Sequence, residues 1–160
     1  MATLPQLIED DIQQVDAALN DFLEQTSASA ALVIDKGGFL IAHQGESDEV
    51  DFTTLAALAS GAFMASQTIA GLVNEKNFNS TYQQGEKFSL LVVDIDEHCL
   101  LVILFESKAG VGLMKYYGSN CCSRIARQLK AATDRNPDGG FDLSVLNMAD
   151  PQELFRKKVA

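Results

Sequence analysis

The chain has 160 residues, enough for one domain with its own hydrophobic core, and its 47% apolar content is that of an ordinary globular protein. The net charge is −10, and residues 1–51 carry eleven acids against one base, whereas the remainder is balanced. The basic surface of a nucleic-acid-binding protein is therefore missing, and nucleic acid is not expected as a partner.

The first third of the chain predicts an amphipathic helix followed by a β-hairpin. Apolar residues recur at helical spacing over residues 6–25, with acids on the opposite face. Two β-type runs, 30–35 and 39–43, then flank Lys36-Gly37-Gly38, whose glycines can supply the positive φ of a tight turn. Asp51 is expected to cap the helix that follows.

The segment from about Phe52 to Asn74 is predicted to be a helix with no charged residue. A helix that is apolar or small all the way round is buried on more than one side. An aliphatic stripe is expected to face the sheet; it consists of Leu55, Leu58, Ala62, Ile69 and Val73. A small-residue stripe is expected to contact a second subunit or a partner protein; it consists of Ala57, Gly61, Met64, Ala65 and Thr68. The alternative is that helices of the same subunit cover both stripes.

The second half predicts three strands, a long helix and a tail. Strands are expected at 80–84, 87–95 and 99–105, and the last two are apolar enough to be covered on both faces. A helix over 111–132 places its small and apolar residues on one side. A Pro-Gly segment then divides the chain into a domain of residues 1–135 and a flexible connector with a short helical tail, residues 136–160. This tail either frays or docks Leu154 and Phe155 on a partner.

The charged helices at the two ends of the domain have two interpretations. The acids of the first helix and the bases of the last either neutralise each other on one face of the sheet or leave an acidic surface for a basic partner. Pairing is the simpler interpretation. Arg124 and Arg127 lie within the last helix, where arginines on a charged face are usually solvated.

The motifs of common enzymes are missing from the sequence. It has no Gly-x-x-x-x-Gly-Lys-Ser/Thr phosphate loop and no Gly-x-Ser-x-Gly elbow. Its two histidines, His43 and His98, are expected to be solvated or structural, and the acids at 94–97 suit a solvated turn. We therefore predict no catalytic residue, no metal and no cofactor.

Cysteine usage and the chain start favour a cytoplasmic protein. Three cysteines, two of them adjacent at 121 and 122, form no disulfide framework and no Cys-x-x-Cys pair, which suits a reducing compartment. The adjacent pair is either a redox switch or, more simply, two small packing residues. The first residues lack the composition of a secretory signal, and the uninterrupted apolar runs are shorter than the roughly 18 residues of a membrane span.

Three stretches resemble the roadblock (dynein light-chain-seven) superfamily. They are the hairpin Leu32–Ala42, the segment Asp51–Gly71 with its Leu-Ala-Ala-Leu-Ala-Ser-Gly core, and the strand Leu100–Phe105 running into Val111–Lys115. Within this superfamily, three shorter segments are most similar to the bacterial MglB branch. They are Asp51-Phe-Thr-Thr-Leu-Ala-Ala-Leu, Tyr82-Gln-Gln-Gly-Glu and Gly112-Leu-Met-Lys. None of these motifs is catalytic, so the resemblance depends on all of these segments occurring together in one chain.

The resemblance implies an α/β sandwich with a five-stranded, mostly antiparallel sheet in the order α-β-β-α-β-β-β-α. The central helix would cover one face, and the first and last helices the other. It also implies a homodimer whose central helices lie side by side. The sheets of the two subunits would join edge to edge through the third strand, at Thr81, Tyr82 and Gln83.

The function implied by the resemblance is regulation of a small GTPase. MglB-type dimers bind a Ras-like GTPase of the MglA type and stimulate GTP hydrolysis by reshaping the GTPase's own active site, without an arginine finger. The hypothesis is a non-catalytic regulator of this kind, acting in cell polarity or motility. An adaptor dimer that leaves hydrolysis unchanged is the alternative. A small-molecule sensor, as in profilin-, PAS- or GAF-like domains, would need a pocket of convergent polar groups that the Leu-, Val- and Ile-filled strands do not predict.

Overall fold

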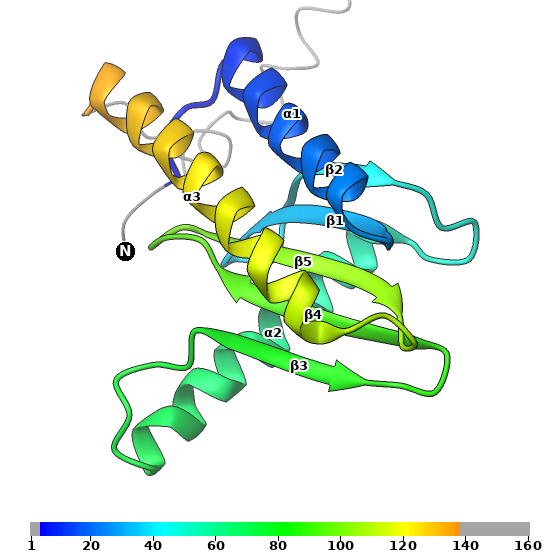
Figure 1. Ribbon diagram of the computed structural model, residues 1–160. Helices are drawn as coiled ribbons and strands as arrows, with labels where there is room; N and C mark the ends of the chain where they lie inside the picture. Colours follow the sequence, from blue (N-terminus) through cyan, green and yellow to red (C-terminus); the bar gives the residue numbers. More distant parts are fainter. Residues whose placement is uncertain (1–3, 138–160) are drawn as a thin grey trace, which may run out of the picture.

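A computed structural model of the protein describes residues 4–137, and its elements follow the expected order (Figure 1). They are α1 (Glu9–Gln25), β1 (Ala28–Asp35), β2 (Leu40–Gly45), α2 (Phe52–Leu72), β3 (Ser80–Gln84), β4 (Phe88–Asp94), β5 (Cys99–Glu106) and α3 (Val111–Arg135). The first helix starts three residues later than predicted, because Ile8 is its N-cap and the residues before it are extended or irregular.

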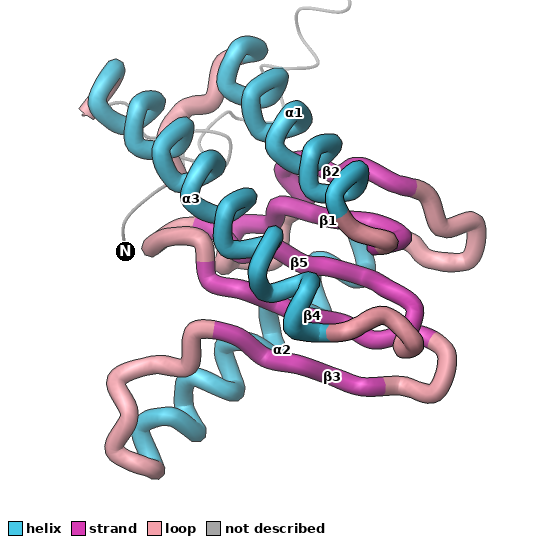
Figure 2. The backbone as a smooth tube through the Cα atoms, in the orientation of Figure 1, coloured by secondary structure: helices cyan, strands magenta, loops and turns pink. Residues whose placement is uncertain are grey.

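The five strands form one sheet in the order β2-β1-β5-β4-β3, and every neighbouring pair is antiparallel (Figure 2). Helices α1 and α3 cover one face and α2 lies on the other, so the predicted layer arrangement is confirmed. The central strand β5 is buried almost throughout. The prediction of full cover holds only in part for β4, because Leu90 on the α2 side is half-buried.

The face under α1 and α3 carries the larger core. From α1 it receives Val15, Leu19 and Phe22. The buried side of α3 is the side that the sequence predicts; it consists of Met114, Gly118, Cys121, Cys122, Ile125, Leu129 and Ala132. Apart from the buried Asp11, the charged residues of both helices lie away from the core, so the two helices together close this face.

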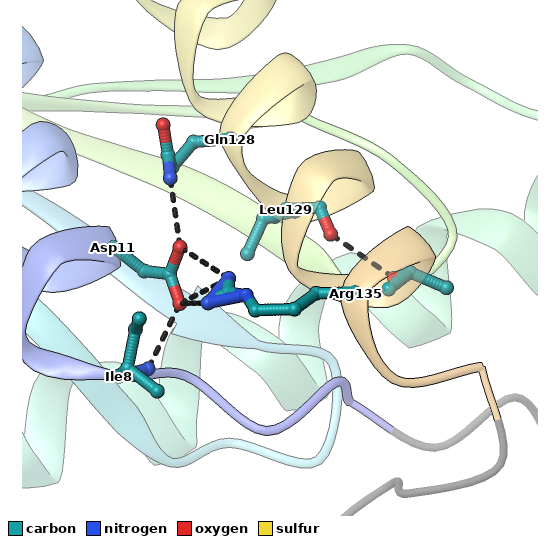
Figure 3. Close-up of polar contacts among 6 residues, drawn as sticks. Ile8, Asp11, Gln128, Leu129 and Arg135 are labelled. Atoms are coloured by element: carbon teal, nitrogen blue, oxygen red, sulfur yellow. Dashed lines mark hydrogen bonds and ion pairs between the residues drawn. The ribbon is translucent and has the colours of Figure 1, made fainter.

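Charged groups join the outer sides of α1 and α3 (Figure 3). The buried carboxylate of Asp11, 1% exposed, accepts hydrogen bonds from the Ile8 backbone N–H (2.8 Å), from Gln128 Nε2 (2.7 Å) and from the guanidinium of Arg135 (2.8–3.1 Å). Arg124 pairs with Asp21 further along the same two helices. The predicted mutual neutralisation of the first and last helices is therefore confirmed.

The β1–β2 hairpin and the start of α2 follow the local signals in the sequence. Gly38 adopts a φ of +97° in the turn, a conformation that residues with a Cβ rarely adopt. Asp51 caps α2 by accepting hydrogen bonds from the Thr53 backbone N–H (3.1 Å) and from Thr54 Oγ1 (2.7 Å). The hydrogen bonds from Thr54 and Thr53 lower the pKa of Asp51 from its ordinary value.

Candidate interaction surface

The sheet-facing side of α2 differs from the predicted one. Its buried residues are Ala56, Ala59, Ser60, Phe63 and Ala70. In the aliphatic stripe, by contrast, Leu58 is 68%, Ile69 52% and Val73 57% exposed, and only Leu55 packs partly against the core. The prediction that this stripe faces the sheet is wrong.

The reason for the difference is the size of the residues that α2 uses against the sheet. Three alanines and a serine let the helix backbone lie close to strands that already carry large side chains, including Leu32, Ile34 and Val102. Phe63 is the one large side chain of α2 that is fully buried. The size and hydropathy of leucine and isoleucine predicted that these residues face the sheet. The narrow space between α2 and the sheet instead accommodates the small residues.

The small-residue stripe is exposed along its whole length; Ala57, Gly61, Met64, Ala65 and Thr68 are all open in the single subunit. A Cβ placed on Gly61 would meet no side chain or neighbouring element within 4 Å. The two stripes together leave most of the circumference of α2 uncovered within residues 4–137. Cover by helices of the same subunit, the alternative interpretation, does not occur there. The contacts that these residues make with a second molecule remain a prediction.

The surface continues beyond the body of the sheet. In Figure 1 the C-terminal end of α2 and the loop after it extend past the edge strand β3, and residues 71–77 are all exposed. On the sheet, Val92 and Val102 are buried under α2, but Phe88 at the start of the same side of β4 is 50% exposed. One copy of α2 therefore covers only part of its face.

The predicted dimer edge, Thr81, Tyr82 and Gln83, lies on a strand with one free side. Strand β3 pairs only with β4, so the polar backbone groups of its other side have no strand partner within the described chain. The Tyr82 ring stacks on Phe105, with centroids 6.2 Å apart, on the α3 side of the sheet. A strand in this position can pair with another strand. Its use by a second subunit stays a prediction.

By length and composition, α2 also resembles a membrane span, as the only such helix within residues 4–137. Only 28% of the relevant stretch is buried. The lengths of the uninterrupted apolar runs in the sequence did not reveal this resemblance to a membrane span. Ser, Thr and Gln interrupt the apolar residues of α2 but add no charge. In the fold the same helix places Ala56, Ala59 and Phe63 in the core of a sheet, so it is a layer of the domain.

Thiols and potential metal ligands occur at several places among the described residues. All three cysteines are buried, and burial raises the pKa of Cys121 and of Cys122 to about 12, which makes them packing residues rather than reactive thiols. No group of three or more potential metal ligands occurs in residues 4–137. Two open hollows on the surface have charged residues in their lining. One is lined by Glu86, Lys87, Phe88, Glu106 and Lys108, and the other by Gln14, Arg124, Arg127 and Gln128. The predicted docking residues Leu154 and Phe155 lie outside the described residues.

Comparison with known families agrees with the fold. A Roadblock/LC7 domain model matches residues 14–105, more than half of the chain. The protein belongs to the Roadblock/LC7 domain family. An uncharacterized protein of Methanocaldococcus jannaschii is 29% identical over 117 residues, which are 73% of this chain and 97% of that protein.

Within this family the chain is similar to solved MglB structures. An MglB with a tetrameric arrangement superposes with a TM-score of 0.77 at 30% identity, over 82% of this chain and 99% of that one. The gliding protein MglB of Thermus thermophilus gives a TM-score of 0.75 with the same identity and coverage. The resemblance to the MglB branch that the sequence motifs indicated is confirmed.

Proposed function

We propose that the protein is a homodimeric, non-catalytic regulator that binds a Ras-like small GTPase of the MglA type in the cytoplasm and stimulates its GTP hydrolysis. The observation that carries this proposal is α2, which has no charged residue from Phe52 to Leu72 and is open along two stripes. The similarity to MglB structures supports the class of partner. Two stripes give the helix room for two contacts at once.

The aliphatic stripe is assigned to self-association. Leu58, Ile69 and Val73 are each more than half exposed, and burying such a side chain contributes about 1.5–3 kcal/mol. Interfaces that are permanently assembled are the more apolar ones. In the same dimer, the free edge of β3 pairs with β3 of a second copy and makes the two sheets continuous.

The small-residue stripe is assigned to the GTPase. Small side chains at Ala57 and Gly61 let another backbone approach, and Met64 adapts to the shape of its partner. Because the stripe carries no charge, binding through it should depend little on ionic strength. Within residues 4–137 the arginines all lie on α3, on the opposite face of the sheet from this stripe. In this proposal stimulation relies on the catalytic groups of the GTPase itself.

The test is phosphate release from a Ras-like GTPase of the MglA type from the same organism, measured with increasing amounts of this protein. Stimulation is expected for the native chain, and Met64→Arg or Thr68→Arg should abolish it while leaving the fold intact. Leu113→Arg on α3 is the matched control, because Leu113 is 45% and Met64 47% exposed; this variant should stimulate like the native chain.

The outcomes separate the alternatives. Binding of the GTPase without faster hydrolysis at saturation would identify an adaptor and contradict the activating role. Normal stimulation by both α2 variants would place the GTPase on another face. Sedimentation at micromolar concentration tests the dimer on its own: a native dimer that Leu58→Arg converts to a monomer is expected, and a native monomer would reject the assignment of the aliphatic stripe.

A further inference from the structure

The tip of the β1–β2 hairpin supports the N-terminal half of α2. The backbone carbonyl of Lys36 accepts a hydrogen bond of 2.6 Å from the buried Ser60 hydroxyl. Next to it, a Cβ placed on Gly38 would lie 3.2 Å from the Cα of Ala57. Ala57 begins the small-residue stripe, so the tip touches the helix where the proposed partner surface starts.

Lys36 also joins this tip to the turn between β4 and β5, at the same end of the sheet. Its backbone N–H donates to the carbonyl of His98 in the β4–β5 turn (2.8 Å). Its ammonium lies 2.9 Å from Oδ1 of Asp94 at the end of β4. One residue therefore connects three parts of the molecule: α2, the hairpin tip and the β4–β5 turn.

The polar groups that Lys36 meets are incompletely satisfied. Among residues 4–137, the buried side-chain atoms without a hydrogen-bond partner are Asp94 Oδ1 and His98 Nδ1. The ammonium of Lys36 balances the charge of Asp94 but is not aligned for a hydrogen bond with it. A buried polar group without a hydrogen bond keeps its desolvation cost. The links from the hairpin tip to this part of the molecule are therefore the Lys36 backbone hydrogen bond and the Lys36–Asp94 ion pair.

We propose that Lys36 is a positioning residue that sets the placement of the N-terminal half of α2, and with it the first part of the small-residue stripe, Ala57 and Gly61. The predicted effect of Lys36 on GTPase binding rests on the proposed function, whereas its effect on the placement of α2 does not. The C-terminal half has its own tether, because the Gln67 side chain donates to the Phe78 carbonyl (2.8 Å) and accepts from the Phe78 N–H (3.1 Å). Loss of Lys36 therefore loosens the first half of the helix and leaves the second half in place.

The experiment compares amide hydrogen exchange in α2 for Lys36→Met, Lys36→Arg and a matched control. Lys108→Met is the control, because it removes an ion pair of the same length, 2.9 Å to Glu106, away from α2. Exchange at residues 56–63 should rise about ten-fold in Lys36→Met, while residues 64–72 keep native rates. Lys36→Arg should restore the native rates, and Lys108→Met should not change them. If Lys36→Met does not fold, Asp94→Asn removes the charge at the other end of the pair.

The functional consequence is measured on the same variants. Lys36→Met should bind the GTPase about ten-fold more weakly, a size typical of residues that act through an intervening element, and Lys36→Arg should bind like the native chain. Native exchange rates at residues 56–63 in Lys36→Met would overturn the inference, as would a rise spread evenly over the whole domain. If exchange rises locally but the native chain does not bind the GTPase, the proposed function fails and the placement of α2 by Lys36 stands.

Discussion

The two faces of the sheet are built from the same kinds of strand but are closed in different ways. On one face, α1 and α3 lie side by side, bury their apolar sides and join their outer sides through Asp11–Arg135 and Asp21–Arg124. On the other face a single helix, α2, touches the sheet mostly through alanines and leaves its larger aliphatic residues open. The first face is completed by the chain itself, whereas the second has apolar surface left over.

The difference shows how a small domain can separate stability from recognition. A helix that must only seal a core carries charge on its other side, as α1 and α3 do. Helix α2 carries no charge on any side, and on the same face of the sheet Phe88 is exposed and Leu90 is only partly buried. Exposed apolar patches of this kind mark interaction surfaces. Substitutions on the two faces should therefore have different consequences.

The largest effect of a single substitution is expected on the sealed face, at the contact between Asp11 and Arg135. Arg135→Ala removes the bidentate partner of a carboxylate that is 1% exposed, and we expect a loss of about 2 kcal/mol in the free energy of unfolding, below the cost for a fully buried pair because the arginine is partly exposed. Arg124→Ala breaks the half-exposed pair with Asp21 and should cost about 0–1 kcal/mol. Urea denaturation of both variants measures the difference; equal losses would show that burial of Asp11 does not govern this seam.

The same seam shows what a sequence can and cannot predict. Charge asymmetry between the first and last helices predicted that they pair, and helical periodicity predicted the buried side of α3, because charged residues exclude the other sides from the core. Neither the charge asymmetry nor the periodicity predicts which residue of α1 contacts which residue of α3. Asp11 meets Gln128 and Arg135 only because α1 and α3 run antiparallel at one register, which the packing of the whole sheet determines.

For α2 the sequence predicted the element, its cap and its unusual surface, but not its orientation. Without a charged residue, no side of the helix is excluded from the core, so periodicity alone cannot select one. The joint at Lys36 was also missed, since its partners Ser60, Asp94 and His98 are far apart in sequence and carry no shared motif.

A change of pH, in place of a substitution, tests the thiols, all of which lie on the sealed face. Burial raises the pKa of Cys99, and it raises the pKa of Cys121 and of Cys122 to about 12. In the unfolded chain a thiol titrates near about 8.5, so the folded chain keeps protons that the unfolded chain releases. Their contribution to stability is complete below that pH and falls as the pH rises toward the folded pKa. At pH 10, which lies about 1.5 units above the unfolded value, we expect a loss of about 2 kcal/mol per thiol.

The measurement is the free energy of unfolding at pH 7 and pH 10 under reducing conditions. A variant with Cys99, Cys121 and Cys122 all changed to Ala is the control, since other groups titrate in the same range. This control should lose less stability between the two pH values than the native chain, even if it starts from a lower value. The same pH dependence in both proteins would show that these thiols are not buried in solution.

The smallest effect compares two helix glycines, one on each face. A Cβ at Gly118 of α3 would lie 3.3 Å from Cδ1 of Ile103, whereas a Cβ at Gly61 of α2 would meet nothing within 4 Å. Alanine stabilises a helix interior by about 0.5–1 kcal/mol relative to glycine, so Gly61→Ala should raise the free energy of unfolding by about that amount. Gly118→Ala should gain less, because the added methyl crowds the sheet.

The same two glycine substitutions should also differ in their effect on GTPase binding. If the partner backbone approaches Gly61, the added methyl group should weaken binding of the GTPase in the same variant that makes the subunit more stable. Gly118→Ala, on the opposite face, should leave that affinity unchanged. Titration calorimetry with both variants decides the point: an unchanged affinity for Gly61→Ala would mean that the glycine serves neither the core nor the partner, and that close approach at this position plays no part in recognition. A substitution that raises the free energy of unfolding but lowers the affinity for the GTPase is expected only where that side of the helix contacts another molecule.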